Sequence, residues 1–244
     1  MPTRLALLRT RSAFKKISRG QIDLAELKPH VMGSSFIVEV GANSGSDSLE
    51  MLNSFPSSRL ICFEPDPRAI AQWKKSITNE RSELREIAIS NYVGTVRFNQ
   101  SGGLPPGVSA EEFPEGWHLS GSVLPPKNHT IVHTWSTFEN FLEVDCETLD
   151  HALGDINWER YERFPVGLIW ADVQGAERQL IEGARDTLTR TRFLYTEYSN
   201  DELYEGQVSL YSLLSLLPEF EIAKIWTNDV LLQNRKYRRF ARHA

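Results

Sequence analysis

The sequence predicts an α/β fold, in which a mostly parallel sheet has helices on both faces and an antiparallel C-terminal edge. Short apolar runs alternate with helical patterns between residues 36 and 98, which is typical of parallel strands joined by helices. The continuous apolar run at 166–171 is typical of a strand that is buried on both faces. The extended runs at 220–226 and 229–233 resemble a pair of antiparallel strands.

Strand and helix alternate regularly in the first half of the chain, because apolar runs and helical periodicity alternate there. The expected elements are, in chain order, strand 36–40, helix 46–54, strand 59–63, helix 67–78, a strand near 84–89 and an extended piece at 95–98. Regular patterning returns at 144–153. It continues with strand 166–171, helix 176–188, strand 192–198, helix 208–217 and the final strand pair. Pro218 ends the last helix, since proline cannot continue it.

Length and composition predict one globular domain with basic ends. The chain has 244 residues, of which 41% are hydrophobic and 24% charged, and these proportions are ordinary for a globular protein. We expect a basic, helical N-terminal extension over 1–30, a single domain over 31–235 and a basic tail over 236–244. Residues 1–22 carry six basic residues and no acid. The body is therefore strongly negative, which argues against nucleic acid as a partner, because phosphate contacts need a positive face.

The sequence shows no clear membrane, disulfide or zinc pattern. No apolar stretch approaches the roughly 20 residues that span a bilayer. Cys62 and Cys146 make no disulfide framework, and no Cys/His spacing resembles a zinc site. We therefore expect a cytoplasmic location. The alternative is that the arginine-rich N-terminus is a transit peptide, which it resembles in composition.

Residues 99–136 break the regular pattern. They are rich in Gly, Pro, Ser, His and Trp, and an irregular stretch this long is usually functional or disordered. Its aromatic and histidine residues favour a lid or a wall of the substrate site. These residues are Trp117, His118, His129, His133 and Trp135. A loop insertion that merely buries a few aromatics is the equal alternative.

The strongest chemical signal is the stretch FIVEVGANSG at 36–45. An apolar run carries Glu39 and ends in a small-residue loop that contains Gly41, Asn43 and Gly45. A second apolar run ends in Glu64, about 25 residues further on, as in a nucleoside-binding crevice. The alternative is an ordinary strand–turn–helix with solvated acids at the strand ends.

The glycine spacing helps to choose between nucleoside cofactors. A dinucleotide fingerprint needs three glycines, and this chain has Gly41, Asn43 and Ser46 at those positions. A dinucleotide-dependent oxidoreductase is therefore disfavoured. S-adenosyl-L-methionine has no phosphate and suits the loop. Glu39 and the loop amides can meet its amino acid part, and Glu64 can accept both ribose hydroxyls.

Asp172 is the candidate for the chemistry. It ends the buried strand at 166–171, and ligands of open α/β sheets bind at the carboxyl ends of strands. Glu64, Asp172 and Glu197 each end a strand, so we expect them to converge on one crevice. Asp172 can orient an acceptor hydroxyl, accept its proton or hold a divalent metal. The alternative is that it caps the following helix.

Together these motifs resemble the FkbM-type methyltransferases. The resemblance rests on VGANSG at 40–45, FEPDP at 63–67, AIS at 88–90, Gly94, Phe98, LD at 149–150, ADVQGAE at 171–177 and GA at 183–184. It covers roughly residues 36–233. It implies a class I, Rossmann-like fold, S-adenosyl-L-methionine as cofactor, and O-methylation of a hydroxyl on a sugar, a glycan or another natural product.

The resemblance also implies roles for individual residues. The cofactor-binding residues would be Glu39, Gly41, Asn43, Gly45, Glu64, Pro65 and Ala88. The first four would line the methionine part, Glu64 would bind the ribose, and Ala88 would lie at the adenine edge. Asp172 would face the methyl group. Gln174 departs from the family, which usually has glutamate there, and this puts a metal-ligand role in doubt.

The sequence leaves several alternatives open. A divalent metal is neither required nor excluded by these residues. A non-catalytic, cofactor-binding scaffold of the same fold remains an alternative to an enzyme. The sequence does not identify the acceptor, whether small molecule or glycan, or the oligomeric state.

Overall fold

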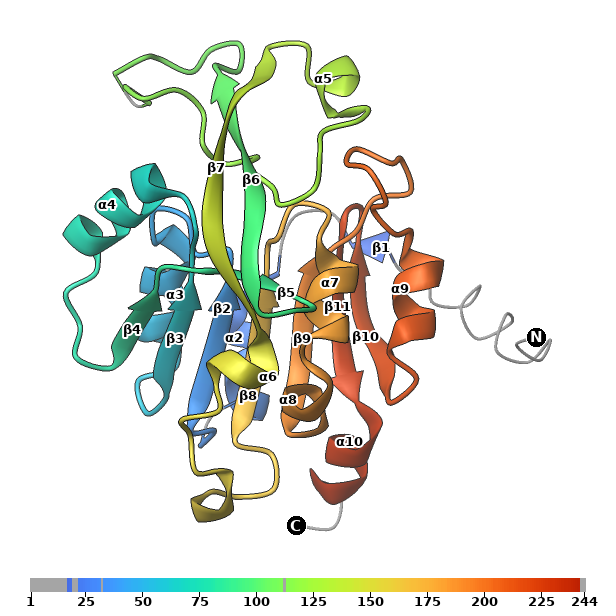
Figure 1. Cartoon of the computed structure of the whole chain (residues 1–244). Coiled ribbons are helices and arrows are strands. Elements are labelled where there is room, and N and C mark those ends of the chain that lie inside the picture. Colours follow the sequence, from blue (N-terminus) through green and yellow to red (C-terminus); the bar gives the residue numbers. More distant parts are fainter. Residues whose placement is uncertain (1–16, 19–21, 32, 112, 242–244) are drawn as a thin grey trace.

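An eight-stranded sheet forms the centre of the molecule (Figure 1). The computed structural model describes residues 17–18, 22–31, 33–111 and 113–241. The strands, in the order in which they lie, are β1 (Ile17–Ser18), β10 (Phe220–Trp226), β11 (Asp229–Asn234), β9 (Thr191–Glu197), β8 (Val166–Ala171), β2 (Phe36–Val40), β3 (Arg59–Phe63) and β4 (Ser82–Arg85). β11 runs antiparallel to both of its neighbours, and the other pairs are parallel. The predicted mostly parallel fold is confirmed, although its antiparallel strand, β11, is third from the edge, behind β1 and β10.

Helices cover both faces of this sheet. One face carries α2 (Leu24–Val31), α3 (Ser46–Ser54) and α4 (Pro67–Ser76), and the other carries α6 (Leu149–Ala152), α7 (Glu177–Glu182), α8 (Arg185–Thr189) and α9 (Leu210–Leu216). Strand β2 shows how two cores arise, because successive side chains of a strand point to opposite faces. Phe36 and Val38 pack in the core under α7 and α9, and Ile37 packs in the core under α3 and α4.

A second, three-stranded sheet stands in front of the first. It has the order β5 (Ala88–Ser90), β7 (Ser136–Thr148), β6 (Gly94–Gly103). In Figure 1 the β6–β7 hairpin crosses the main sheet and extends above it. The strand expected near 84–89 is therefore two strands in two sheets. β4 pairs with β3, and β5 pairs with β7 after a short break at 86–87.

The expected long loop at 99–136 is also corrected. Residues 99–103 are the end of β6, α5 (His129–Val132) lies inside the stretch, and β7 begins at Ser136. The irregular part is 104–128. Leu142, Val144 and Cys146 alternate with acids along β7, and this alternation is the sequence signal of a half-buried strand. Because glycines and prolines are frequent in the neighbouring residues, the sequence pattern did not predict the β6–β7 hairpin.

The helix expected at 176–188 is broken into α7 and α8 at Gly183. A Cβ atom on Gly183 would lie 2.1 Å from the carbonyl oxygen of Ser90, so only glycine allows β5 to approach this closely. A short 3-10 helix, η2 (Trp158–Arg160), precedes β8.

The structure describes part of both expected terminal extensions. Residues 1–16 and 19–21 of the predicted helical extension lie outside the described residues. Residues 17–18 form β1, and α2 packs Leu24 and Leu27 against the core under α3 and α4, while the domain boundary near residue 31 stays a prediction. At the other end, α10 (Arg235–Ala241) takes up most of the expected tail. Its Tyr237 donates a hydrogen bond of 3.0 Å to the carbonyl oxygen of His30, and the helix is docked by this contact.

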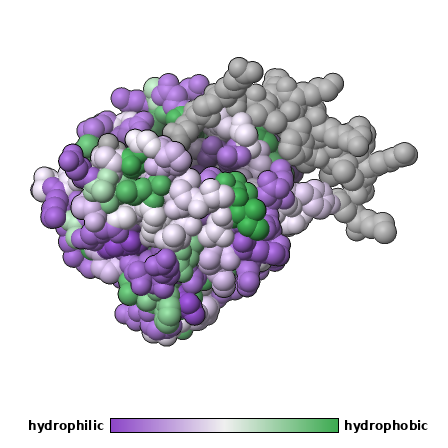
Figure 2. All heavy atoms as spheres, turned by 90° about the horizontal axis from the view of Figure 1, so that it is seen from above, coloured by the Kyte–Doolittle hydropathy of each residue, from purple (hydrophilic) through white to green (hydrophobic). Residues whose placement is uncertain are grey.

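The described surface is mainly polar. Within the described parts, no helix is long and apolar enough to cross a membrane. Figure 2 shows the molecule from above, where apolar residues form several separate small areas among polar ones. Ile131 and Val132 of α5 are the most exposed of the large apolar side chains in the described residues, at 70% and 58%.

Asp150 should stabilise the junction between α6 and α8. Its carboxylate accepts hydrogen bonds from the backbone amide of Asp186 (2.9 Å) and from the amide and hydroxyl of Thr187 (2.7 Å each). Asp150→Ala leaves these groups unpaired, so we expect the free energy of unfolding in urea to fall by about 1.5–3 kcal/mol. Asp155→Ala is the control, because Asp155 is 67% exposed and pairs only with Arg85. Its loss should be below about 1 kcal/mol, and equal losses in the two variants would contradict the capping role.

Candidate active site

A cavity lies at the carboxyl ends of β2, β3 and β8, where the sequence predicts the site. Six of the eight predicted site residues lie on its wall: Gly41, Asn43, Glu64, Pro65, Ala88 and Asp172. Residues of the 104–128 segment close the cavity on another side, among them His118, Gly121 and Ser122. The structure therefore joins the glycine loop, the end of β3 and the 104–128 segment around one space. Contact of these six residues with a cofactor stays a prediction.

Gly41 lets the loop after β2 lie directly against the end of β8. Its φ is 88°, and a Cβ atom there would be 1.9 Å from the carbonyl oxygen of Asp172. The backbone amide of Asp172 in turn donates to the carbonyl oxygen of Val40 at 2.9 Å. Asn43 follows with a φ of 44°, a left-handed conformation that asparagine tolerates better than most residues.

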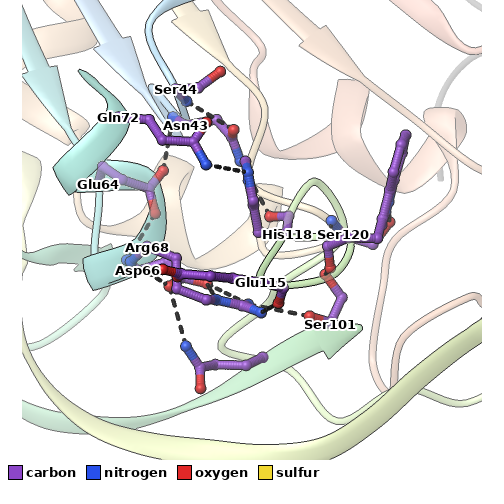
Figure 3. A network of polar contacts seen from close by, with 12 residues as sticks. Asn43, Ser44, Glu64, Asp66, Arg68, Gln72, Ser101, Glu115, His118 and Ser120 are labelled. Carbon is purple, nitrogen blue, oxygen red and sulfur yellow. Dashed lines mark hydrogen bonds and ion pairs between the residues drawn. The ribbon is translucent and has the colours of Figure 1, made fainter. Parts of the chain in front are cut away.

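Glu64 is held in place by two backbone amides (Figure 3). Asn43 donates to its Oε2 and Asp66 to its Oε1, both at 2.8 Å. Each carboxylate oxygen can accept more than one hydrogen bond, so the carboxylate can still accept two ribose hydroxyls. The side chain is buried, and burial raises its pKa to about 7.

Asp66 and Arg68 tie the start of α4 to the hairpin and the 104–128 segment. Asp66 caps α4 by accepting a hydrogen bond from the backbone amide of Arg68. The guanidinium of Arg68 forms a salt bridge with the same carboxylate, with Nη2 2.7 Å from Oδ2. The same guanidinium donates to the carbonyl oxygens of Ser101 (3.1 Å) and Glu115 (3.3 Å). Figure 3 shows these side chains converging below the helix start.

His118 lies on the cavity wall and is held there by two contacts. Its carbonyl oxygen accepts from Asn43 Nδ2 at 3.1 Å, which fixes it to the glycine loop. The ring Nε2 atom lies 3.1 Å from Gln72 Nε2, which is a donor, so Nε2 accepts and the ring proton belongs on the buried Nδ1. Burial, followed by the charge of Arg68, lowers the pKa of His118, and the ring is neutral at pH 7. The sequence placed His118 in a lid but gave it no role in the cofactor site.

Glu39 and Gly45 are not among the residues that line the cavity, and their contact with a cofactor stays a prediction. Glu39 points to the α3 face of the sheet, like Ile37, because side chains alternate along β2. Its Oε2 accepts from Ser48 Oγ (2.5 Å) and Cys62 Sγ (3.1 Å). A Cβ atom on Gly45 would lie 2.9 Å from side-chain atoms of α4 and the residue after it, so this glycine serves helix packing. Glu39 therefore contacts α3, and Gly45 packs against α4.

Asp172 and Glu197 meet at the ends of neighbouring strands, as expected from the sequence. Gln174 lies between them, and its Nε2 donates to Asp172 Oδ1 at 2.5 Å and to Glu197 Oε2 at 3.4 Å. Burial raises the pKa of Asp172, while the charge of Asp172, followed by burial, raises that of Glu197. Asp172 does not cap the next helix, because α7 begins at Glu177 and its cap position is Ala176, which makes no side-chain bond.

The described residues hold no group of three or more His, Cys, Asp or Glu side chains arranged for a metal ion. At the acid pair, the side chain that faces both carboxylates is the amide NH₂ of Gln174, which is a donor and does not ligate cations. The residues present therefore do not fit a metal between Asp172 and Glu197.

The family model of the FkbM methyltransferase domain matches residues 39–238. The chain belongs to the FkbM methyltransferase family. The family predicted from the motifs is confirmed, and with it an S-adenosyl-L-methionine-dependent methyltransferase on a class I, Rossmann-like fold.

Relatives extend this likeness over most of the chain. The 2-O-methyltransferase NoeI of Sinorhizobium fredii strain NGR234 is 41% identical over 226 residues, which cover 91% of this chain and 86% of that protein. Methyltransferase 1 of Beauveria bassiana is 28% identical over 160 residues, covering 62% and 59%. Among solved structures, Aeropyrum pernix fibrillarin with bound S-adenosyl-L-methionine is 12% identical, with a TM-score of 0.43 and coverage of 86% and 72%.

Two further residues of this FkbM methyltransferase lie at the site but were not predicted from the sequence. Asp229 begins β11, and because β11 is antiparallel, its first residue lies at the same edge as the ends of β8 and β9. Its charge contributes to the raised pKa of Glu197. Tyr204 lies in the loop after β9 and donates to the carbonyl oxygen of Ser120 at 2.8 Å. The antiparallel direction of β11 could have predicted that Asp229 lies at this edge of the sheet. No local sequence pattern indicates Tyr204.

Glu39 should make stability depend on pH. Burial raises its pKa from an ordinary value of 4.5 to about 8. Between these values the folded chain keeps a proton that the unfolded chain has lost, so stability falls as the pH rises through this window. We expect the wild-type protein to lose about 3–5 kcal/mol more than Glu39→Gln between about pH 4.5 and pH 8. Urea unfolding across this range measures the difference, and parallel pH profiles for the two proteins would contradict a buried, protonated Glu39.

Proposed function

We propose that this FkbM methyltransferase methylates a hydroxyl of a sugar, a glycan or another natural product. The observation that carries the proposal is that Glu64 and Asp172, one suited to ribose hydroxyls and one to an acceptor proton, line the same cavity. The 2-O-methyltransferase name of the relative from S. fredii supports oxygen as the atom that is methylated.

The cavity residues fit S-adenosyl-L-methionine. The loop of Gly41 and Asn43 offers backbone close to the end of β8, Glu64 offers two carboxylate oxygens, and His118 adds an imidazole ring to the cavity wall. When bound, the cofactor supplies an electrophilic methyl group. The protein must then orient the acceptor hydroxyl and take its proton. Asp172 suits the second task because burial raises its pKa toward neutrality and so makes it a stronger base.

The charge around Asp172 bears on the acceptor. Asp47, Glu197 and Asp229 all act on the pKa of groups in this centre, and none of them has a salt bridge within the described residues. Carboxylates accept hydrogen bonds from hydroxyl groups but repel phosphates. We therefore propose an acceptor rich in hydroxyl groups and not a nucleic acid. The cytoplasmic location and the role of residues 99–136 as a lid or a wall of the substrate site remain predictions.

The central test combines binding with product formation. Calorimetry with S-adenosyl-L-methionine and, separately, with NAD distinguishes a methyltransferase from a dinucleotide enzyme. Incubation with methyl-labelled S-adenosyl-L-methionine and a panel of sugars, glycans and metabolites, read by mass spectrometry, should then reveal a product heavier by one methyl group. Tight cofactor binding with no product on a broad panel would favour the non-catalytic scaffold.

Glu64 should control cofactor affinity. Glu64→Gln keeps the shape but loses the charge-assisted acceptor, which is worth roughly 1.5–3 kcal/mol, so the Kd for S-adenosyl-L-methionine should rise about tenfold or more. Because burial raises the pKa of Glu64 to about 7, wild-type affinity should also weaken as the pH falls below that value. Glu83→Gln is the control, since Glu83 pairs with Arg59 and Arg85 away from the cavity. An unchanged Kd in a folded Glu64→Gln protein would rule out the ribose assignment.

Asp172 should affect turnover more than binding. Asp172→Asn retains the shape and removes the base, so the rate of methyl transfer should fall by about 10²–10⁴. Calorimetry should show little change in the Kd for S-adenosyl-L-methionine. Asp145→Asn, on the exposed side of β7, should leave both quantities unchanged. Full activity of Asp172→Asn would show that this carboxylate is not the proton acceptor.

A further inference from the structure

Gln174 bridges two carboxylates that the sheet places side by side. Ala171 of β8 is in register with Thr196 of β9, so the next residues, Asp172 and Glu197, end their strands as neighbours. The amide nitrogen of Gln174 is 2.5 Å from Asp172 Oδ1 and 3.4 Å from Glu197 Oε2. The bridge is therefore asymmetric, with its short bond to Asp172.

The other end of Gln174 fixes the orientation of its amide. Tyr204 Oη lies 3.2 Å from Gln174 Oε1, and Ser122 Oγ donates to the backbone carbonyl of Gln174 at 2.8 Å. An ionised Asp172 only accepts hydrogen bonds, so the NH₂ group of Gln174 faces it and Oε1 lies on the side of Tyr204. The one hydroxyl proton of Tyr204 is directed mainly at the carbonyl oxygen of Ser120 (2.8 Å) and more weakly at Oε1 (3.2 Å). Gln174 also has a φ of 48°, a conformation that costs energy in residues other than glycine and persists only where neighbours enforce it.

The acid pair is surrounded by acidic and phenolic side chains. The titratable groups that face it come from α3, α7, β9, β11 and the loop after β9. They are Asp47, Glu177, Tyr195, Tyr204 and Asp229. No salt bridge of the described residues reaches Asp172 or Glu197. Both carboxylates bond the same amide nitrogen, and the charge of Asp172 is the largest cause of the raised pKa of Glu197. Two like charges held this way repel each other, so the pair is more stable with one proton than with two negative charges.

We propose that Gln174 is the positioning residue that keeps Asp172 ionised and leaves the shared proton on Glu197. A hydrogen bond to a charged acceptor is stronger than one to a neutral acceptor, so the short amide bond stabilises the negative charge on Asp172. The inference rests on the proposed function, in which Asp172 is the base. It adds the reason why one acid of the pair has that role and the other does not.

An amide at position 174 acts differently from a carboxylate at the same place. A glutamate at position 174 would add a third negative charge to the pair instead of a donor, and it would raise both pKa values further. The glutamine instead directs the positive end of its amide dipole at Asp172, and it does so without a positively charged group. Through Tyr204 and Ser122 the same side chain and backbone are attached to the 104–128 segment, so the position of that segment affects the base.

The test is a titration of the side-chain carboxyls by ¹³C NMR in the full chain, without any acceptor. In the wild-type protein, Asp172 should titrate at a lower pH than Glu197. Gln174→Met has a similar length but no donor, and it should raise the midpoint of Asp172 by about one to two pH units. Gln100→Met is the matched control, because Gln100 donates a 3.1 Å bond to a different aspartate, Asp66. It should leave Asp172 unchanged.

The outcomes separate this inference from the proposed function. An unchanged Asp172 midpoint in Gln174→Met, or a wild-type protein in which Glu197 loses its proton first, would overturn the inference. If Gln174→Met does not fold, the isosteric Gln174→Glu replaces it and should raise the Asp172 midpoint as well; no rise would again overturn the inference. With an acceptor in hand, the acid limb of the pH–rate profile should move by the same amount while the KM for S-adenosyl-L-methionine stays constant. Failure of the wild-type protein to bind S-adenosyl-L-methionine would instead refute the proposed function, and the carboxyl titration does not depend on that result.

Discussion

The site depends on one close approach between two backbones. The loop at Gly41 lies so near the carbonyl of Asp172 that a single Cβ atom would collide with it at 1.9 Å. The amide of Asp172 completes the contact by bonding to Val40. This contact brings the cofactor loop and the candidate base to one cavity wall, although they lie more than a hundred residues apart in the chain. A side chain at position 41 would separate them, so the glycine is a geometric requirement of the site.

Three acids of the site region, Glu39, Glu64 and Asp172, are held by hydrogen-bond donors and not by cations, unlike Asp66, which pairs with Arg68. Glu64 is bound by two backbone amides, Asp172 by the amide of Gln174, and Glu39 by a hydroxyl and a thiol. Burial raises the pKa of all three. At Glu39 the raised pKa favours the protonated form, which can be buried at lower cost. At Asp172 a raised pKa is the property that the proposed role as a base requires, because a carboxylate that is less stable in its ionised form is a better base.

Much of the fold and part of the site were accessible from the sequence. Strand β2, the glycine loop and Glu64 have local patterns, and Asp172 follows from a buried strand that ends in an acid. The direction of the Glu39 side chain was not accessible, because alternation along β2 tells which residues share a face, but only the helices packed on each face show which face it is. His118 depends on contacts between segments far apart in the chain, for which no local pattern exists.

The 104–128 segment is hydrogen-bonded both to the residues around Glu64 and to those around the Asp172–Glu197 pair. On the cofactor side it is held by Asn43 and Arg68, and on the acid side by Tyr204 and by the backbone of Gln174. Any displacement of this segment must therefore break contacts with the glycine loop, with the acid pair, or with both. The same bonds hold His118 at the cavity wall and the backbone of Gln174 beside Asp172, so one segment contacts both parts of the candidate site.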